Sequence, residues 1–453
     1  MRYKVFWCKV NKYYTDKWLN SSYLKWKDGI FVASCVVTDK AKRKWIRFVK
    51  SESKSLEDGE KIYISWCGAF KDGKAQDDFF HLYPELDALK DQIEVLDEDP
   101  EQLEKSGAKI ISQLTPNPSL YNRGEQKVLS LEKGEDLGVG WKKSIDLSKI
   151  EKLRKFNKTQ IYTKKFILIQ WGCDSFCTFC LTVQKRGRHF YRDKDDILKE
   201  ILEFEEIGGK EVVLTGVNLS AWGLKNTNQI WESRFAELLQ YLLDNSSIAR
   251  LRISSLWPEF IDDAVLKVFE NERIYPHFHY SIQSGSSSTL KAMARHYDWE
   301  YMRDLLLRNR AIEREDWVSI SIWADIIVWF PGETEEHFQE TCDLVRQCKI
   351  TKIHAFPFSP HEYWENVPAG FFGDQISDEV KKDRMKRLNE IWDEIRANFI
   401  TSQKWKTLKV LVERVSSTGF KWWTQNYIEV TEKNFEVQSG EIKRNEIITG
   451  TLK

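Results

Sequence analysis

The feature that most constrains the fold is a series of short apolar runs that alternate with amphipathic stretches across the middle of this 453-residue chain. Short apolar runs bounded by turn formers are typical of buried parallel strands. They lie at 165–170, 211–216, 249–255, 277–283, 325–330 and 352–358. Within 193–209, apolar side chains recur at helical spacing behind an Asp-rich start, namely at Ile197, Ile201, Phe204 and Ile207. Six such units predict an open or partly closed parallel β/α barrel, with its chemistry at the carboxyl ends of the strands.

Three cysteines, Cys173, Cys177 and Cys180, follow the first of these strands within eight residues. A disulfide pairing leaves one thiol over, and the N-terminus lacks the features of a signal peptide. Structural zinc usually takes four ligands, often from two Cys-x2-Cys pairs, and no second pair follows. Thiolates also hold iron–sulfur clusters, and three of them leave one iron of a [4Fe–4S] cube open. The spacing therefore favours a cluster with a free iron position over zinc.

Three strand-like runs near the N-terminus each end in a cysteine: Cys8, Cys35 and Cys67. Helical stretches at 13–25 and 38–51 separate them, so we expect a βαβαβ arrangement. Ligands bind at the carboxyl edge of parallel α/β sheets, and this edge would bring the three thiols to one site. The alternative is three buried cysteines that act as small apolar side chains.

The stretch "GCDSFCTFC", followed by "RGR", resembles the radical S-adenosylmethionine (SAM) methylthiotransferases. Further motifs occur in the order of that family: "VVLTGVN", "LRISSL", "QSGSSSTLKAM", "DIIVWFPGETEEHF" and "FPFSPHE". The resemblance implies a radical SAM barrel in which the open iron of the Cys173, Cys177 and Cys180 cluster binds SAM. Reductive cleavage of SAM would then give a 5′-deoxyadenosyl radical. The resemblance also implies a second [4Fe–4S] cluster, held by the three N-terminal cysteines, that delivers sulfur.

Five residues close predicted barrel strands, and we expect them to neighbour SAM: Thr215, Gly216, Asn218, Ser254 and Gln283. The two remaining cysteines, Cys342 and Cys348, lie six residues apart on one predicted helix. We interpret them as packing or surface residues rather than ligands.

The C-terminal stretch, from about 405, changes to short alternating runs that predict a small antiparallel β-barrel. It resembles the RNA-binding TRAM module that ends these enzymes. We therefore expect an α/β protein of three domains. They are an N-terminal βαβ cluster domain (1–115), a partial parallel (β/α)6 radical SAM core (159–372) and a TRAM-like module (401–453). A linker (116–158) and a helix (373–400) connect them.

The resemblance implies a transferase that adds a methylthio group to C2 of adenosine 37 of tRNA. A single-stranded anticodon loop suits this, because an exposed base can enter a barrel mouth. Short shared phrases such as "KVNKYYTDK" and "WTQNYIEV" favour the subgroup acting on N6-threonylcarbamoyladenosine. The isopentenyladenosine subgroup is the first alternative and a ribosomal-protein aspartate the second. An iron–sulfur electron carrier or a plain RNA-binding protein is the non-enzymatic alternative.

The composition limits the partners. The chain is neutral, with 69 basic and 69 acidic residues, so charge alone does not predict a nucleic-acid partner. No apolar run has the length of a membrane span, so we expect a soluble, cytoplasmic monomer. The expected partners are the tRNA anticodon loop and an electron donor such as flavodoxin or ferredoxin.

Tryptophan is unusually frequent, at 19 residues against 22 glycines, where average usage would give roughly 32 glycines. Three tryptophans stand where the motifs of the resembled family have glycine: Trp7, Trp66 and Trp329. Four further tryptophans are suspected on weaker grounds: Trp257, Trp323, Trp364 and Trp422. Glycine serves where the backbone takes positive φ or approaches a ligand closely. We hypothesise that the source reads UGA as glycine; a Trp-rich natural protein is the alternative.

Overall fold

The computed structural model describes residues 1–6, 9–36, 38–71, 74–75, 78–96, 160–224, 233–361, 367–373, 377–415 and 420–453. The predicted linker at 116–158 lies outside these residues, as do Cys8, Trp7 and Trp364.

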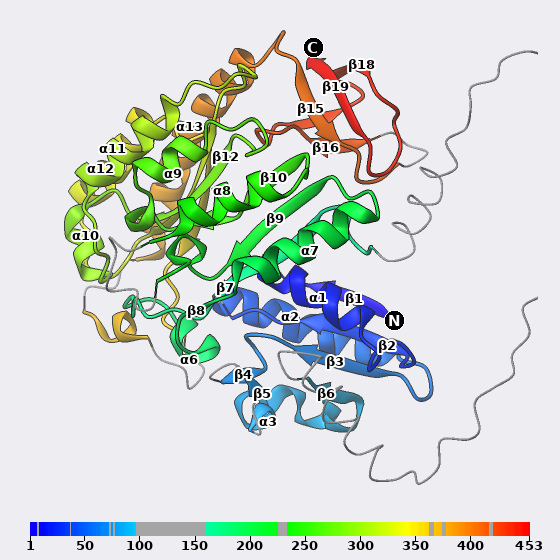
Figure 1. Ribbon diagram of the computed structural model, residues 1–453. Helices are drawn as coiled ribbons and strands as arrows, with labels where there is room; N and C mark the ends of the chain where they lie inside the picture. Colours follow the sequence, from blue (N-terminus) through cyan, green and yellow to red (C-terminus); the bar gives the residue numbers. More distant parts are fainter. Residues whose placement is uncertain are drawn as a thin grey trace, which may run out of the picture.

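The N-terminal part is a four-stranded sheet in which all neighbouring strands are parallel (Figure 1). The strands run in the order β1 (Arg2–Val5), β2 (Gly29–Ala33), β3 (Lys61–Ser65) and β6 (Ile93–Val95). Its helices are α1 (Lys9–Asn20), α2 (Asp39–Glu52) and the short α3 (Phe79–Leu82), and 3-10 turns occupy η1 (Ser53–Ser55) and η2 (Pro84–Gln92). A two-stranded ribbon joins β4 (Phe70–Lys71) to β5 (Lys74–Ala75). The predicted strand–helix alternation is therefore present, but β2 and β3 each end two residues before their cysteine.

The central part carries the predicted parallel strands in two sheets. The first has the order β10 (Arg250–Ile253), β9 (Glu211–Gly216), β7 (Lys165–Trp171) and β8 (Phe190–Tyr191), of which β8 is antiparallel. The second has the order β11 (Ser255–Leu256), β12 (His277–Gln283), β13 (Ser321–Val328) and β14 (Lys352–Pro357). A parallel bridge from Leu251 to Ile274 joins them. The expectation of an α/β fold with parallel sheets is confirmed.

Helices cover the outer face of these sheets (Figure 1). They are α7 (Lys194–Glu206), α8 (Phe235–Asn245), α9 (Asp263–Val268), α10 (Ser287–Ala292), α11 (Trp299–Arg310) and α12 (Glu335–Gln347). The short helix α6 (Thr182–Arg186) lies instead beside β4 of the N-terminal part (Figure 1). Single 3-10 turns lie at η3 (Leu219–Ala221), η5 (Pro258–Phe260) and η6 (Pro368–Phe371).

Helix α7 has the cap and the buried face that its sequence predicts. The Asp193 side chain caps its start by accepting a hydrogen bond from the Asp195 amide at 2.8 Å, and the first turn is acidic. Ile197, Ile201 and Phe204 are buried against the sheet, as their helical spacing predicts. Gly208, with φ at 85°, ends the segment.

The C-terminal part follows the long helix α13 (Asp378–Ser402) and is antiparallel. One sheet has the order β15 (Leu408–Leu411), β19 (Ile447–Leu452) and β18 (Phe435–Ser439), and a second pairs β16 (Lys421–Trp423) with β17 (Glu429–Thr431). An antiparallel bridge joins Val410 to Thr424. Antiparallel sheets are therefore present, and a closed TRAM-like barrel stays a prediction, as do the domain boundaries.

The N-terminal sheet and the barrel share a hydrophobic core. Phe166 and Leu168 of β7 and Val213 of β9 pack with the N-terminal apolar residues, whereas Ile167 and Ile169 pack with the outer helices. Helix α1 lies against β7 (Figure 1). The N-terminal part therefore covers the inner face of the first barrel sheet, which brings its strand ends close to the barrel.

The two remaining cysteines and the apolar character of the helices were also predicted from the sequence. Cys342 and Cys348 are buried in the apolar core beside α12, in agreement with a packing role. In the part of the chain that the structure describes, no helix combines the length and apolar character that crossing a membrane requires.

Candidate functional site

The three barrel cysteines lie in a loop directly after β7. Gly172 begins it with φ at 67°, and a Cβ atom there would stand 1.8 Å from the Arg188 carbonyl oxygen. Only glycine fits such an approach, so this residue fixes how the loop leaves the strand. Cys173 and Cys177 are buried, and Cys180 is half-buried.

The three sulfurs share one electrostatic environment. Burial, together with the nearby Cys180 and Cys177, raises the pKa of Cys173 to about 12, against the lowering effect of hydrogen bonds from Ser175. Burial likewise raises the pKa of Cys177 to about 11, against the lowering effect of Arg295. Burial therefore leaves the Cys173 and Cys177 thiols protonated at neutral pH. A bound metal would supply the positive charge that deprotonates them.

Hydrogen-bond donors surround the sulfurs. The backbone amides of Ser175 and Thr182 point at Cys173 Sγ and Cys180 Sγ, at 3.5 and 3.4 Å. Arg295 Nη1 lies 3.4 Å from Cys177 Sγ. Hydrogen bonds to the cysteine sulfurs help to set the reduction potential of an iron–sulfur cluster. Three thiols of one loop, close enough for Cys180 and Cys177 to act on Cys173, and these donors fit a [4Fe–4S] cluster, and the assignment of the ligands stays a prediction.

Arg295 is held in place by a buried network that sequence reasoning missed. Its guanidinium pairs with Glu259 at 3.5 Å, donates to Tyr297 Oη at 3.0 Å and lies 3.9 Å from the centroid of the Trp257 ring. Its partners come from η5, β12 and the segment after α10, so no local sequence signal could have shown the network.

The N-terminal cysteines lie at a second strand edge. Ala33 of β2 pairs with Ser65 of β3, so Cys35 and Cys67 both stand two residues beyond the same register position. The Ser34 hydroxyl donates to the Ser65 carbonyl at 2.7 Å and ties the two ends together. Both cysteines are buried, and Cys8 lies outside the described residues. Two of the three predicted ligands therefore share one edge in the described structure.

Arg186 connects the two cysteine edges. It ends α6, six residues after Cys180, and donates to Cys67 Sγ from Nε at 3.0 Å and from Nη2 at 2.8 Å. A second link comes from the Asp39 amide, which donates to Ser359 Oγ at 3.1 Å. The carboxyl ends of the N-terminal strands therefore face the carboxyl ends of the barrel strands.

A cavity of about 170 Å³ lies between these edges, and we call it the cysteine-edge cavity. Thr38 of the N-terminal part lines it together with Phe179 of the cysteine loop and Gln283 at the end of β12. The remaining lining residues are Asp325, Ile327, Phe356, Pro357, Phe358, Ser359 and His361. Three parts of the chain that are distant in sequence thus enclose one space beside the barrel cysteines.

Asp325 joins this cavity to the barrel interior. Its Oδ1 lies 2.9 Å from His279 Nε2 and 3.4 Å from His354 Nδ1, on the neighbouring strands β12 and β14. These histidines outweigh the effect of burial and hold the pKa of Asp325 far below its usual range. The ligand-type atoms of the three residues lie within 4.8 Å of one another. The triad therefore places a fixed negative charge at the floor of the cavity.

The predicted SAM neighbours separate into two groups. Thr215 and Gly216 end β9, Asn218 follows it, and Ser254 lies beside them because its amide donates to the Leu214 carbonyl at 3.0 Å. The Thr215 hydroxyl and the Asn218 amide group are buried and have no hydrogen-bond partner among the described residues, so both fit a polar ligand at this edge. Gln283 ends β12 in the second sheet and lines the cysteine-edge cavity. Their contact with SAM stays a prediction.

Two of the three leading suspect tryptophans have positive φ, at 89° for Trp66 and 59° for Trp329. Trp66 is fully buried beside Cys67, and its ring packs against Tyr14 and Trp171. Among the weaker suspects, Trp257 has ordinary backbone, with φ at −97°. Two tryptophans that we did not suspect, Trp317 and Trp405, also have positive φ, at 54° and 69°. Positive φ is rare for bulky residues, so these values support the glycine hypothesis at Trp66 and Trp329.

Parts of the sequence are similar to known proteins. Residues 167–345 match the Radical SAM superfamily. Over 294 residues the chain is 32% identical to "Threonylcarbamoyladenosine tRNA methylthiotransferase MtaB" of Bacillus subtilis (strain 168), which covers 63% of this chain and 62% of that protein. Over 280 residues it is 34% identical to "tRNA-2-methylthio-N(6)-dimethylallyladenosine synthase" of Geobacillus thermodenitrificans (strain NG80-2), which covers 62% of this chain and 51% of that protein.

The chain thus spans less than two thirds of the length of these curated relatives. Among solved structures, the radical SAM methyltransferase TsrM from Kitasatospora setae overlaps with a TM-score of 0.44 at 13% identity. That overlap covers 75% of this chain and 63% of TsrM.

Proposed function

The chain carries a domain of the radical SAM superfamily, and from this premise we propose that it is a tRNA methylthiotransferase. Its substrate is N6-threonylcarbamoyladenosine at position 37, and it adds a methylthio group to C2 of the base. The name of the Bacillus relative supports this choice of substrate.

The observation that carries the proposal is that residues close to both sets of cysteines line one cavity. Arg186 spans from the end of the barrel cysteine loop to Cys67, and Thr38, Phe179 and Gln283 line the space between. Transfer of sulfur to an unreactive C–H bond needs a sulfur source beside the radical-generating site. An electron carrier needs no ligand cavity there, so the arrangement favours the enzyme over the carrier.

The chain's own residues would prepare this site. When bound, the two clusters supply the electron that cleaves SAM and the sulfur that is transferred. Arg295 and Arg186 each direct a buried guanidinium at one cysteine sulfur, which offsets negative charge on the cluster ligands. Gln283 and Asp325 offer an amide and a carboxylate to the N–H groups of a nucleobase in the cavity.

The reductant is a flavodoxin- or ferredoxin-type donor in this proposal, and SAM lies along the edge formed by Thr215, Gly216, Asn218 and Ser254. The orphaned polar atoms of Thr215 and Asn218 support that position. The antiparallel C-terminal sheets serve as the RNA-binding TRAM-like module.

A second substrate has specific support. The Geobacillus relative is named for dimethylallyladenosine, so methylthiolation of N6-isopentenyladenosine 37 is the competing proposal. Nucleoside mass spectrometry of tRNA from a deletion strain separates the two. Loss of 2-methylthio-N6-threonylcarbamoyladenosine supports our choice. Loss of the methylthio-isopentenyl nucleoside alone assigns the competing substrate, and unchanged tRNA rejects both.

A further inference from the structure

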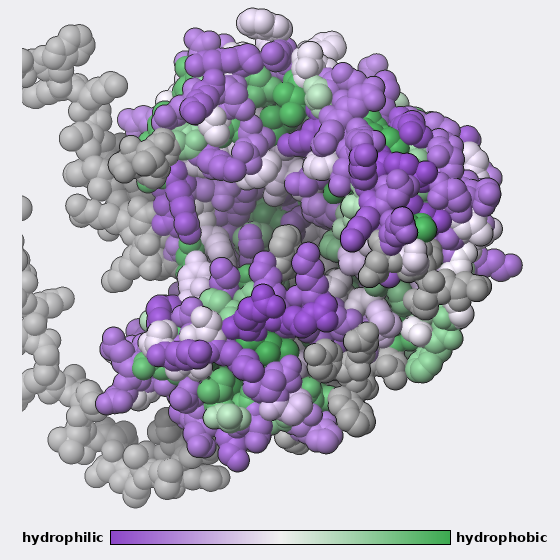
Figure 2. All heavy atoms as spheres, turned by 180° about the vertical axis from the view of Figure 1, so that it is seen from behind, coloured by the Kyte–Doolittle hydropathy of each residue, from purple (hydrophilic) through white to green (hydrophobic). Residues whose placement is uncertain are grey.

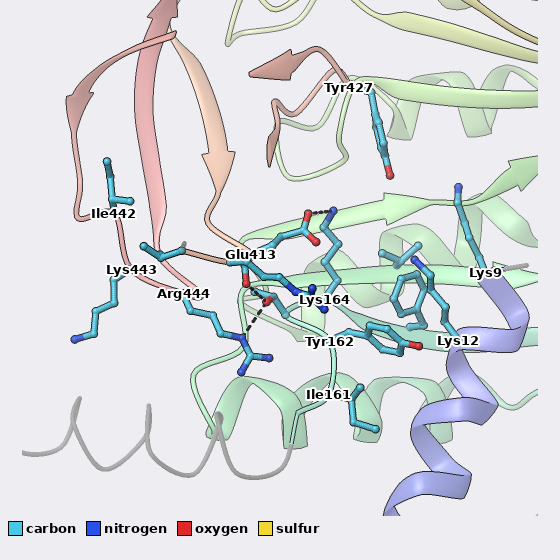
Figure 3. Close-up of a pocket in the computed structure, with 15 residues that line it drawn as sticks. Lys9, Lys12, Ile161, Tyr162, Lys164, Glu413, Tyr427, Ile442, Lys443 and Arg444 are labelled. Atoms are coloured by element: carbon cyan, nitrogen blue, oxygen red, sulfur yellow. Dashed lines mark hydrogen bonds and ion pairs between the residues drawn. The ribbon is translucent and has the colours of Figure 1, made fainter. Parts of the chain in front are cut away.

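A second, larger cavity lies at the opposite end of the barrel strands, where three parts of the chain meet. It measures about 770 Å³, and we call it the seam cavity. Lys9 and Lys12 reach it from α1, the segment 161–164 from the entry to β7, and the loops 413–415 and 442–444 from the C-terminal sheets (Figure 3). Its size is in the range of small-molecule sites. Hydrophilic side chains also border a hollow between the N-terminal part and the rest of the molecule (Figure 2).

The seam cavity is strongly cationic although the whole chain is neutral. Its lining contains the basic residues Lys9, Lys12, Lys164, Arg414, Lys443 and Arg444, against one carboxylate, Glu413. Lys164 engages that carboxylate at 2.7 Å. Neither Lys9 nor Lys12 has an ion-pair partner within the described ranges. The cavity therefore holds positive charge that its own acid does not neutralise.

Burial of these lysines has an electrostatic cost. Burial lowers the pKa of Lys9 and of Lys12, and the repulsion between them lowers the pKa of Lys9 further. For Lys12, the charge of Lys164 acts in the same direction. A bound anion would offset both effects, because an opposite charge nearby favours the protonated ammonium.

Aromatic and apolar groups form the floor of the seam cavity. Phe166, Val213, Tyr162 and Tyr427 line it, and the Lys12 ammonium lies 5.0 Å from the centroid of the Phe166 ring. The Tyr162 hydroxyl is buried without a hydrogen-bond partner among the described residues. Rings beside unpaired cations form the combination that binds single-stranded nucleic acid, since bases stack on rings while phosphates meet cations.

Lys9 connects the seam cavity electrostatically with the cysteine-edge cavity. Its side chain points from α1 towards Tyr427, and the charge of Asp325 acts on its ammonium (Figure 3). Asp325 also lines the cysteine-edge cavity. The two cavities are therefore connected electrostatically through the barrel interior, with the cations on the seam side and the carboxylate on the cysteine side.

We propose that the seam cavity binds the single-stranded RNA substrate by one base on Tyr162 and Phe166 and by backbone phosphates on Lys12, Arg414 and Lys443. This inference rests on the proposed function only in taking RNA as the substrate class. Aromatic rings beside the cations favour RNA over an acidic protein, and a recessed cavity of about 770 Å³ favours it over a flat lipid surface.

The test measures binding without turnover. Fluorescence anisotropy follows a labelled RNA hairpin with a single-stranded loop on the full, cluster-loaded chain, without SAM or reductant. The double variant Arg414→Glu/Lys443→Glu changes two exposed rim residues, so it should fold normally. We expect its Kd to rise about tenfold or more, and the slope of log K against log salt to flatten by about 0.7 for each phosphate that the variant no longer neutralises.

Matched variants separate charge from stacking. Lys267→Glu on α9, an exposed residue that pairs with Glu270, makes a single charge reversal away from the cavity and should leave Kd unchanged. Tyr162→Leu should weaken binding by roughly fivefold or more, and Tyr162→Phe by much less, because a stacked ring is worth about 1–3 kcal/mol per base.

The outcomes distinguish the inference from the function. RNA binding by the wild type that the rim variant and Tyr162→Leu leave intact overturns the seam inference alone. A wild type that binds no RNA hairpin overturns the RNA function as well. Displacement of the RNA by inorganic phosphate, but not by chloride of equal ionic strength, would make the cavity a simple anion site and would also overturn the inference.

Discussion

The two ends of the barrel strands differ in charge, size and the origin of their residues. At the carboxyl ends, buried cysteines receive arginine hydrogen bonds beside a cavity of about 170 Å³ that contains the ionised Asp325. At the amino ends, the 770 Å³ seam cavity has six basic residues and one acidic residue. In our proposal, one end serves chemistry in a confined space and the other binds a large polyanion.

The largest expected effect is at the cysteine loop. Cys177→Ala should lower the iron content from about eight to about four atoms per chain and abolish 5′-deoxyadenosine formation, because the barrel cluster loses a ligand. Iron analysis and chromatography of the quenched reaction measure both quantities. Cys342→Ala, which removes another buried thiol, should retain the iron content and 5′-deoxyadenosine formation. Equal loss in the two variants would contradict a specific role of the cysteine loop.

Arg186→Gln tests the contact between the two cysteine edges. It should reduce the methylthiolated product by about tenfold or more while 5′-deoxyadenosine formation persists, because Cys67 loses two charge-assisted hydrogen bonds. Arg188→Gln is the control, since that neighbour is exposed and pairs with Asp174. If both products fell together in Arg186→Gln, Arg186 would serve the barrel cluster instead.

Trp329→Gly and Trp66→Gly test whether these two positions, which have positive φ, are glycine in the natural protein. Replacing a buried Trp by a small residue ordinarily costs about 3–5 kcal/mol, and we expect that cost for Trp45→Gly, because Trp45 is fully buried on α2. At Trp329 and Trp66, relief of positive φ should leave the free energy of unfolding unchanged or higher. UGG at codons 7, 66 and 329 of the gene would end the hypothesis.

The smallest effect concerns pH at the cysteine-edge cavity. Burial and the nearby Lys42 lower the pKa of His361 to about 4, so the folded protein binds fewer protons here than the unfolded chain. Stability from this group is therefore complete above pH 6.5 and decreases as pH falls towards 4, by about 1–3 kcal/mol. Denaturant unfolding at several pH values should show a smaller decrease for His361→Gln. An identical decrease in that variant and in the exposed-site control His296→Gln would contradict this.

Local patterns predicted the parts of the molecule that local physics determines. The spacing of Ile197, Ile201 and Phe204 located α7, and apolar runs located the parallel strands. The span of β13, Ser321–Val328, is shifted from the predicted 325–330, because the polar start of the strand hid it and Trp329 turns away with positive φ.

The contacts between parts of the chain could not be predicted in the same way. Arg186 meets Cys67 across 119 residues of sequence, and the Arg295 network and the seam cavity each join distant segments. Their existence depends on how the N-terminal sheet packs on β7 and β9. No periodicity or spacing in a single segment records that packing, so only the structure reveals which charges are close together.

The central claim is that the barrel cysteines generate the radical and the N-terminal cysteines supply the sulfur. The most direct measurement incubates the anaerobically reconstituted chain with undermodified tRNA, SAM and dithionite, and quantifies 5′-deoxyadenosine and methylthiolated nucleoside in the same sample. We predict both products for the wild type, 5′-deoxyadenosine alone for Cys67→Ala, and neither for Cys177→Ala. Methylthiolated nucleoside from either variant, or no 5′-deoxyadenosine from the wild type, would contradict the claim.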